Sequence, residues 1–220
     1  EARSCFFVQW DGGAILLDCG VRREAGAPLE RVYPALTPEI AKGLRAVFLS
    51  HAHEDHTAAL PYLRALGYRG PVYATAPTAA LVPGFLRKWA SYSLGHGDRL
   101  PFGEQDLAEV RVTPLPLGTR QVPGLPGLTV TFGRSGHMLG SVWMRFAWEG
   151  VGSLLYTGDM ALEGRLLAAD PLPKGEFLIL ECAYAGSRLA QDAQYRRLLE
   201  LAAETVEGNG RVLLPVPPRG

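Results

Sequence analysis

The sequence lacks several features that would place a protein outside the ordinary globular class. No apolar run approaches the roughly 20 residues that a membrane-spanning helix needs, so we expect no membrane association. There are only three cysteines, Cys5, Cys19 and Cys182, which lie far apart and form no C-x-x-C pair. This pattern predicts structural thiols in a reducing compartment, and we therefore expect a cytoplasmic protein. A catalytic thiol has no motif to support it.

Net charge is also lacking. The chain has 22 basic and 22 acidic residues, which neither predicts nor excludes a nucleic-acid partner, because a local basic groove can exist in a neutral chain. Lysine is scarce, since Lys42, Lys88 and Lys174 are the only lysines and every other basic residue is arginine. Arginine can bind phosphate bidentately. Codon usage in a GC-rich genome explains the same bias, and we favour that explanation.

Histidine is scarce too, and its distribution is the most informative feature of the chain. Three of the five histidines lie in residues 51–56 (HAHEDH), directly after the apolar run 46–49. Imidazole and carboxylate groups are the ligands of zinc and its neighbours in the first transition row. Without a metal, this crowding would place like charges or unpaired ring nitrogens side by side. The H-x-H-x-D-H pattern therefore predicts a metal site rather than a polar loop with incidental histidines.

Length and patterning predict an α/β protein. At 220 residues and 47% hydrophobic content, the chain can form one large domain, or one domain and part of another. Strands are expected at residues 5–9, 14–18, 46–49, 72–74, 128–132, 142–148, 154–157, 177–180 and 212–216. Helices are expected from residue 37 and over 57–66, 77–92 and 191–207, while 95–126 is rich in Gly and Pro and carries no clear pattern. A sandwich of sheets flanked by helices would bury both faces of the apolar strands.

The histidine cluster follows a strand, and residues two apart in an extended segment point to the same side. His51 and His53 can therefore bind one ion, while Asp55 and His56, at the turn into the next helix, can face a second. Two metals about 4 Å apart form a clamp for in-line displacement at phosphorus. A bound zinc also lowers the pKa of its water to about 7. The pattern favours a metal-activated hydroxide as nucleophile, because no matched pair of side chains for general acid–base catalysis is found.

Other polar residues at strand ends are interpreted in this context. His137 lies between glycines in residues 135–141, and Asp159 follows an apolar strand, where a carboxylate can bridge two ions. Taken singly, His137 would equally be a structural histidine and Asp159 a turn residue. Asp18, at another strand end, is predicted to be a turn residue that also supports the histidine loop. His96 lies between glycines with no partner and is predicted to be a surface-loop residue.

Taken in order, these motifs resemble the metallo-β-lactamase superfamily, and within it the β-CASP nucleases. The cluster at 51–56, followed by His137 and Asp159, is similar to the successive metal motifs of the superfamily. The segments that resemble the β-CASP subgroup are 135–141 (SGHMLGS), 156–160 (YTGDM), 181–184 (ECAY) and 212–216 (VLLPV). That subgroup includes RNA 3′-end-processing endonucleases and some DNA-repair nucleases. The resemblance covers residues 4–216.

The resemblance implies an αββα sandwich with a dinuclear zinc site at the strand ends and the start of an inserted β-CASP domain. By match, one zinc ion would be held by His51, His53 and His137. The other would be held by Asp55 and His56, with Asp159 bridging both ions. Asp55 would also orient the attacking hydroxide.

The resemblance also implies a catalytic role for Glu181. It matches an acidic residue at the junction of the two domains of the β-CASP nucleases. It can equally be a strand-end acid that caps the following loop. Both interpretations of Glu181 are kept as expectations.

One departure from the family concerns completeness. The family carries two further histidines, one thought to be the general acid and one that completes the second zinc site, but no histidine follows His137 here. We therefore expect this chain to be the amino-terminal part of a longer enzyme. Residues 1–182 would be the first part of the metallo-β-lactamase domain, and residues 183–220 the truncated beginning of the β-CASP domain.

Three functions compete. The leading interpretation is a zinc-dependent phosphodiesterase, a ribonuclease that cleaves single-stranded RNA, with DNA as a less favoured substrate. The second is a small-molecule hydrolase of the same superfamily that acts on a thioester, lactone or β-lactam, for which the segments 181–184 and 212–216 would be unneeded. The third is an inactive scaffold subunit, which the intact set of six metal positions argues against.

Overall fold

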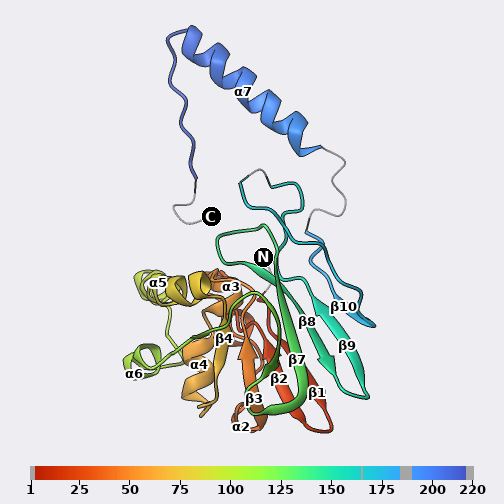
Figure 1. The fold of residues 1–220 in the computed structure, drawn as a ribbon. Helices are drawn as coiled ribbons and strands as arrows, with labels where there is room; N and C mark the ends of the chain where they lie inside the picture. Colours follow the sequence, from red (N-terminus) through yellow and green to blue (C-terminus); the bar gives the residue numbers. More distant parts are fainter. Residues whose placement is uncertain (1–2, 165, 184–189, 217–220) are drawn as a thin grey trace.

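The computed structural model of the protein describes residues 3–164, 166–183 and 190–216 (Figure 1). The strands are β1 Phe6–Trp10, β2 Gly13–Leu17, β3 Leu44–Phe48, β4 Val72–Ala74, β5 Thr113–Pro114, β6 Gly118–Val122, β7 Leu125–Arg134, β8 Val142–Trp148, β9 Gly152–Tyr156 and β10 Phe177–Ile179. The helices are α1 Leu29–Val32, α2 Pro38–Gly43, α3 Glu54–Thr57, α4 Leu60–Ala65, α5 Ala76–Gly95, α6 Glu104–Ala108 and α7 Gln191–Glu207.

Two five-stranded sheets lie at the centre of this fold. The first has the order β1-β2-β3-β4-β5, with β1 antiparallel to β2 and the remaining pairs parallel. The second has the order β10-β9-β8-β7-β6, antiparallel except for the β9–β10 pair. Parallel neighbours require crossover connections, which α2, α4, and α5 with α6 supply. A mixed α/β fold with two sheets agrees with the expected fold class.

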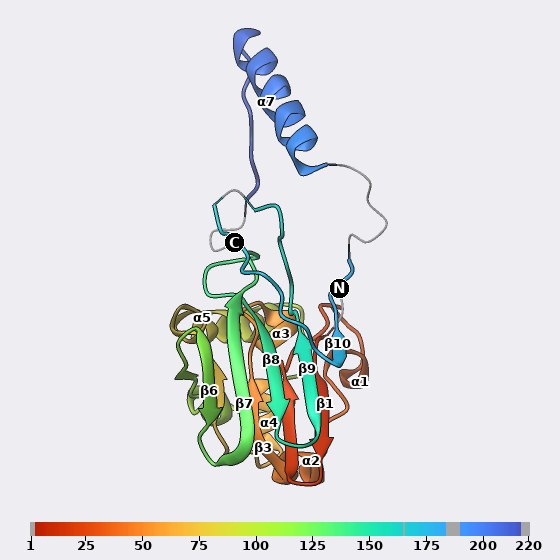
Figure 2. The same ribbon diagram turned by 45° about the vertical axis from the view of Figure 1, so that its right-hand side comes forward.

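Strand β2 shows how the sequence builds the layers, because alternate side chains point to opposite faces. Ala14 and Leu16 belong to the apolar cluster between the first sheet and the helices. Ile15 and Leu17 belong to the cluster between the two sheets. Figure 1 shows α3 to α6 on the outer side of the first sheet. Figure 2 shows no helix over the outer face of the second sheet in the described part of the chain, so the second helical layer of an αββα sandwich stays a prediction.

Local signals in the sequence account for most element boundaries. The expected hairpin joins β1 to β2 around residues 11–12. Thr37 caps α2 by accepting a hydrogen bond from the Ile40 N–H, and Pro38 occupies the first turn, as predicted. The helix expected at 57–66 is instead two short helices, α3 and α4, because Pro61 stands in the first turn of a second helix.

The prediction of a strand at residues 212–216 is wrong. These residues have no regular secondary structure, and the Leu213 side chain is 88% exposed. A strand forms only where a neighbour can complete its hydrogen-bond ladder. Figures 1 and 2 show α7 and this segment extending away from the two sheets, where the described chain supplies no such neighbour.

The expected start of a second domain is only partly described. Residues 184–189 and 217–220 of that segment lie outside the described residues. Helix α7 confirms the expected helix at 191–207, and its apolar side chains Leu198, Leu199 and Val206 are exposed. The division of the chain after residue 182 stays a prediction. None of the helices in the described ranges combines the length and apolar character that crossing a membrane requires.

Phe146 tests how strongly the two sheets depend on their shared core. Its ring is fully buried and packs edge to face on Phe48, with ring centroids 5.0 Å apart. We expect Phe146→Ala to lower the free energy of unfolding by about 3–5 kcal/mol, because a large cavity would remain between the sheets. Phe7→Ala is the matched control, since the Phe7 ring is 45% exposed and should contribute less than about 1 kcal/mol. Urea denaturation measures both, and equal losses would contradict this layer assignment.

Candidate metal centre

The predicted metal ligands converge at one edge of the sandwich, where β3, β7 and β9 end. His51 and His53 lie in the loop after β3, and Asp55 and His56 lie in α3. His137 comes from the loop between β7 and β8, and Asp159 from the segment after β9. The Val142 N–H donates a 2.9 Å hydrogen bond to the Ser50 carbonyl, which joins the two sheets at this edge.

Three histidines face one point. His51 Nε2 and His137 Nε2 each lie 3.2 Å from His53 Nδ1. Two nitrogens bound to a tetrahedral zinc at the usual distance of about 2.0–2.1 Å lie roughly 3.3–3.4 Å apart. The ring nitrogens are therefore spaced as the ligands of one ion would be, and this part of the predicted grouping is present in the geometry.

Asp159 lies between this triad and His56. Its Oδ2 is 3.6 Å from His137 Nε2 and 3.8 Å from His51 Nε2, while its Oδ1 is 3.3 Å from His56 Nε2. A second possible ligand group consists of His51, His56 and Asp159, whose ligand atoms all lie within 4.8 Å of one another. The Asp55 Oδ2 lies 3.8 Å from His56 Nε2. The two carboxylate oxygens of Asp159 thus point to different histidines, which is the geometry that a bridging ligand requires.

The buried carboxylate of Asp18 forms hydrogen bonds with the loop that carries the candidate ligands. Asp18 has no exposed surface and adopts a positive φ of 55°, which suits the turn position that the sequence predicted. It accepts hydrogen bonds from the Ser50 N–H at 2.7 Å, from the Ser50 hydroxyl at 2.6 Å and from His56 Nδ1 at 2.7 Å. It also accepts one from the Tyr156 hydroxyl. Asp18 therefore supports the histidine loop, as expected, and also joins the two sheets.

These bonds select which nitrogen of each ring faces the site. The Ser50 hydroxyl donates its proton to Asp18, so it accepts from His51 Nδ1, which lies 3.0 Å away. This leaves the lone pair of His51 on Nε2, the nitrogen near His53. His56 Nδ1 donates to Asp18, so its Nε2 faces Asp159 and Asp55. A carboxylate behind a histidine fixes the ring orientation that metal binding needs.

The surroundings lower the pKa of two histidines of the site and raise the pKa of a third. Burial lowers the pKa of His51 well below its usual value, and the neighbouring His56, His137 and His53 lower it further. Burial also lowers the pKa of His137 against the opposing effect of Asp159. Burial alone would lower the pKa of His56, but Asp18 and Asp159 outweigh it and raise that pKa to about 10. His51 and His137 are therefore neutral and ready to bind a metal, whereas His56 must lose a proton first.

The pKa values of the two aspartates of the site are shifted in opposite directions. Burial raises the pKa of Asp55, although His56 opposes this effect. Burial would also raise the pKa of Asp159, but its hydrogen bond to His56 and the charge of that ring lower it overall. Asp159 therefore has the lower pKa of the two carboxyl groups.

Packing of the loop at residues 135–141 fixes His137. The Ser135 hydroxyl donates to the Ser141 hydroxyl at 2.9 Å, which closes the loop. The Gly140 carbonyl accepts from the hydroxyls of Thr75 and Thr78 at the start of α5, at 2.6 and 3.0 Å. A Cβ at Gly140 would lie 2.8 Å from the Thr78 nitrogen, and its φ is +89°, so only glycine fits there.

Glu181 and His96 belong to neither of the two ligand groups. The Glu181 N–H donates to Thr157 Oγ1 at 2.9 Å, and its carboxylate accepts from the Ala183 N–H. This is the loop-capping contact that the sequence allowed, although the charge of Glu181 also acts on His137. The catalytic part of Glu181 stays a prediction. His96 is exposed at the end of α5, with Nδ1 bonded to the Tyr92 carbonyl, as its surface assignment implied.

Sequence reasoning missed two residues of the centre, Ser50 and Tyr156. Both are almost fully buried and bind Asp18 from opposite sheets. Ser50 directly precedes the histidine cluster, so a polar residue at the end of an apolar run was a usable signal. Tyr156 lies in the segment 156–160 that resembles the β-CASP nucleases, but nothing in the sequence linked it to Asp18, which is 138 residues away in the chain.

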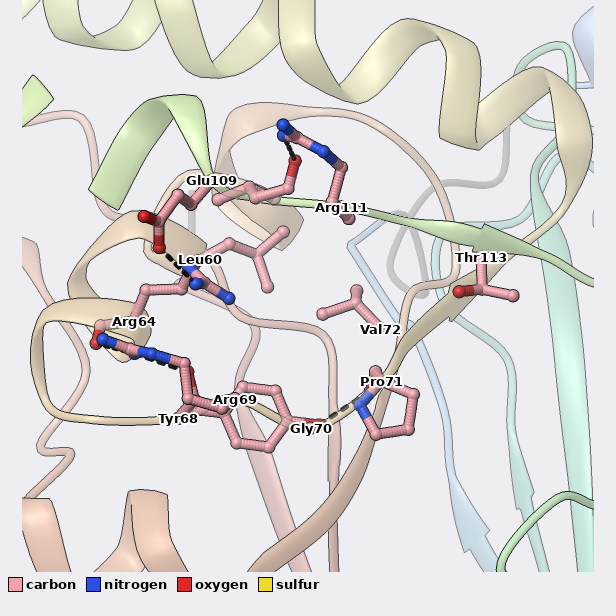
Figure 3. Close-up of a pocket in the computed structure, with 11 residues that line it drawn as sticks. Leu60, Arg64, Tyr68, Arg69, Gly70, Pro71, Val72, Glu109, Arg111 and Thr113 are labelled. Carbon is pink, nitrogen blue, oxygen red and sulfur yellow. Dashed lines mark hydrogen bonds and ion pairs between the residues drawn. The ribbon is translucent and has the colours of Figure 1, made fainter. Parts of the chain in front are cut away.

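A separate pocket of about 400 Å³ lies at the starts of β4 and β5, the opposite edge of the first sheet from the histidines (Figure 3). Its arginines are occupied by protein groups. Arg64 pairs with Glu109 at 2.6 Å, Arg69 donates to the Arg64 carbonyl, and Arg111 donates to the Val110 carbonyl. This pocket is not part of the candidate metal centre.

The raised pKa of His56 predicts a pH-dependent stability in the metal-free protein. The folded-state pKa of about 10 exceeds the ordinary value of 6.5. The contribution to the free energy of unfolding is therefore complete below pH 6.5 and is lost as the pH rises through about 10. We expect the Tm of chelator-treated protein to fall over this range, with a clearly weaker dependence in His56→Gln. His96→Gln, at an exposed histidine, should follow the unchanged protein, and identical slopes in all three would contradict the ion pair with Asp18.

Curated proteins from several organisms are similar in sequence to nearly the whole of this chain. The chain is 35% identical over 224 aligned residues to Transcription termination factor FttA of Methanothermobacter thermautotrophicus, covering 97% of this chain and 35% of that protein. It is 33% identical over 226 residues to Integrator complex subunit 11 of Danio rerio, covering 97% of this chain and 37% of that protein. The chain thus spans about a third of the length of these relatives.

A solved structure shares the fold, and a family profile matches the sequence. The fold is similar to that of a protein of unknown function from Enterococcus faecalis V583, with a TM-score of 0.57, 19% identity, and coverage of 91% of this chain and 54% of that one. The profile of the Metallo-beta-lactamase superfamily matches residues 1–207. This match confirms the resemblance drawn from the motifs. The chain therefore belongs to the metallo-β-lactamase superfamily.

Proposed function

We propose that the protein is a dinuclear zinc phosphodiesterase that cleaves RNA. The observation that carries the proposal is the position of Asp159, whose two carboxylate oxygens face different histidines, one within the triad and one behind it. The nitrogen-rich donor set suits zinc, and the spacing of the triad suits tetrahedral coordination. When bound, two zinc ions would generate a nucleophile from water and stabilise the charge that develops on a phosphate.

The donor set fits one ion fully and supplies most of the ligands of a second, for which the family carries one more histidine than this chain does. His51, His53 and His137 would hold one ion, because their ring nitrogens already face one another at ligand spacing. His56 and Asp55 would hold the other, with Asp159 shared between the two. The Asp18 carboxylate accepts the Nδ1 proton of His56 and keeps Nε2 directed at the ion.

Asp55 is proposed as the catalytic residue of the chain. It lies beside His56 at the first turn of α3, and its side chain is 22% exposed, so it can still reach a bound substrate. A carboxylate there can accept a hydrogen bond from the attacking water and orient it. Glu181 is kept as a second proposed catalytic residue, on the resemblance of residues 181–184 to the β-CASP motif and on its electrostatic effect at His137.

RNA is the proposed substrate for two reasons. The segments 135–141, 156–160 and 181–184 resemble those of β-CASP nucleases, which act on nucleic acids. One group of relatives is named for transcription termination, a process that acts on a transcript. DNA and a small-molecule thioester, lactone or β-lactam remain the alternatives that an assay must separate.

Zinc stoichiometry tests the ligand assignment without any substrate. We expect native mass spectrometry to find two zinc ions in the full-length protein and one in either His53→Ala or His56→Ala, because each variant removes a ligand of only one ion. Asp159→Ala should weaken both sites and keep the fold, since the strand core does not depend on it. His96→Ala should bind as the unchanged protein does, and two tightly bound ions in both single-site variants would contradict the assignment.

Cleavage of an end-labelled single-stranded RNA tests the activity. We expect cleavage that chelation abolishes and zinc restores, a loss of at least about 100-fold in His53→Ala, and little change in His96→Ala. A single-stranded DNA of the same sequence and a panel of thioester, lactone and β-lactam substrates should be turned over much more slowly. Turnover of a small ester by zinc-loaded protein that leaves RNA intact would replace the proposal with the small-molecule hydrolase. Zinc binding without any turnover would favour the scaffold interpretation.

A further inference from the structure

Two cysteines lie side by side behind the candidate metal centre. In the β1–β2 pair, Phe6 is opposite Leu17, and the Gly20 N–H donates to the Ser4 carbonyl at 2.9 Å. Between the Phe6–Leu17 pair and the Ser4–Gly20 hydrogen bond, the first segment has one residue, Cys5, whereas the second has two, Asp18 and Cys19. The chain therefore forms a β-bulge, in which Asp18 and Cys19 together oppose Cys5.

The bulge turns the two thiols to the same side. Asp18 takes the positive φ, and its carboxylate points toward Tyr156 between the sheets. Cys19 points the other way and is fully buried in the apolar cluster on the helical side of the first sheet. Cys5 packs against that same cluster and is only partly buried. Opposed residues whose side chains share a face satisfy the main geometric requirement for a disulfide.

The backbone of Cys19, and that of Ser4 next to Cys5, is hydrogen-bonded to the segment that carries Asp55 and His56. The Cys19 N–H donates to the His56 carbonyl at 2.7 Å, and the Cys19 carbonyl accepts from the Ala59 N–H at 2.9 Å. The Ser4 N–H, beside Cys5, donates to the Asp55 carbonyl at 2.8 Å. A Cβ at Gly20 would lie 1.6 Å from the Asp55 carbonyl oxygen, so the two segments are in closest contact there. A movement of Cys19 toward Cys5 must therefore move His56.

The accessibility of the two thiols sets the order of reaction. The Cys19 side chain is fully buried and is hydrogen-bonded with that of Cys5, so an oxidant cannot reach Cys19 first. Cys5 reaches the surface in part, so it is the thiol that meets the oxidant.

We propose that Cys5 and Cys19 form a reversible disulfide under peroxide, and that closing it weakens metal binding at His56. In the first step the Cys5 sulfur attacks the peroxide oxygen, which gives a sulfenic acid at Cys5 and releases water. In the second step the Cys19 sulfur displaces the hydroxyl of that sulfenic acid, which leaves as water with the Cys19 proton. Two S–H bonds are replaced by one S–S bond, and the two electrons reduce one peroxide to two waters.

Peptide mapping tests the disulfide directly and requires neither metal nor RNA. Trypsin cuts after Arg3 and Arg22, so one peptide, residues 4–22, carries both thiols, while Cys182 lies on the separate peptide 175–188. After peroxide treatment and alkylation without reduction, we expect peptide 4–22 to be unalkylated and lighter than its reduced form by two hydrogen atoms. Dithiothreitol should restore two alkylation sites. Cys5→Ser should lose the effect, and Cys182→Ser should retain it.

The second measurement concerns the effect on the metal loop, which rests on the proposed zinc site. After removal of peroxide, we expect the oxidised protein to bind the second of two zinc ions about 10-fold or more weakly than the reduced protein, as displaced supporting contacts usually cause. Cys5→Ser should show no such difference. Two alkylated thiols in peptide 4–22, a sulfenic acid that never closes, or a bridge to Cys182 would overturn the disulfide. A closed disulfide with unchanged zinc affinity would overturn its coupling to His56.

Discussion

The carboxylate of Asp18 is the group on which the rest of the structure depends. A buried charge costs several kcal/mol unless its partners compensate, and Asp18 finds all of them within the fold. Ser50 and His56 bind it from the first sheet, and Tyr156 binds it from the second. The sheets therefore meet at a polar contact as well as at an apolar core. Removing any one partner would leave this buried carboxylate short of part of its compensation.

This one charge also determines the chemistry at the edge of the sheets. Through Ser50 it leaves the lone pair of His51 on the nitrogen that faces the site. By direct contact it orients His56 and favours the charged form of that ring in the metal-free protein. The same polar network that supports the sandwich thus orients His51 and His56 toward the candidate metal centre. Stability and the proposed function depend on the same residues here.

The motifs at residues 51–56, His137 and Asp159 were sufficient to predict the superfamily and the two-sheet fold, and the structure brings these residues together. Their role as metal ligands stays a proposal. The motifs could do so because each motif follows an apolar strand, and strand ends meet at one edge of a sheet. The failures have an equally physical cause. The segment 212–216 has the composition of a strand, but a strand requires a neighbouring ladder, and composition carries no information about that neighbour. The two helices around Pro61 differ from one expected helix for a local reason that the proline itself supplied.

By itself, the sequence determined the types of ligand, their order and the alternation that places Leu16 and Leu17 in different layers. These properties follow from residue chemistry and from the period of a strand, which are local. Only the tertiary structure decided that Tyr156 completes the Asp18 network, that Asp159 faces two groups of histidines, and that Cys5 lies opposite Cys19. Each of these is a contact between segments that the chain brings together by packing, and no local pattern encodes the partner of a buried polar group.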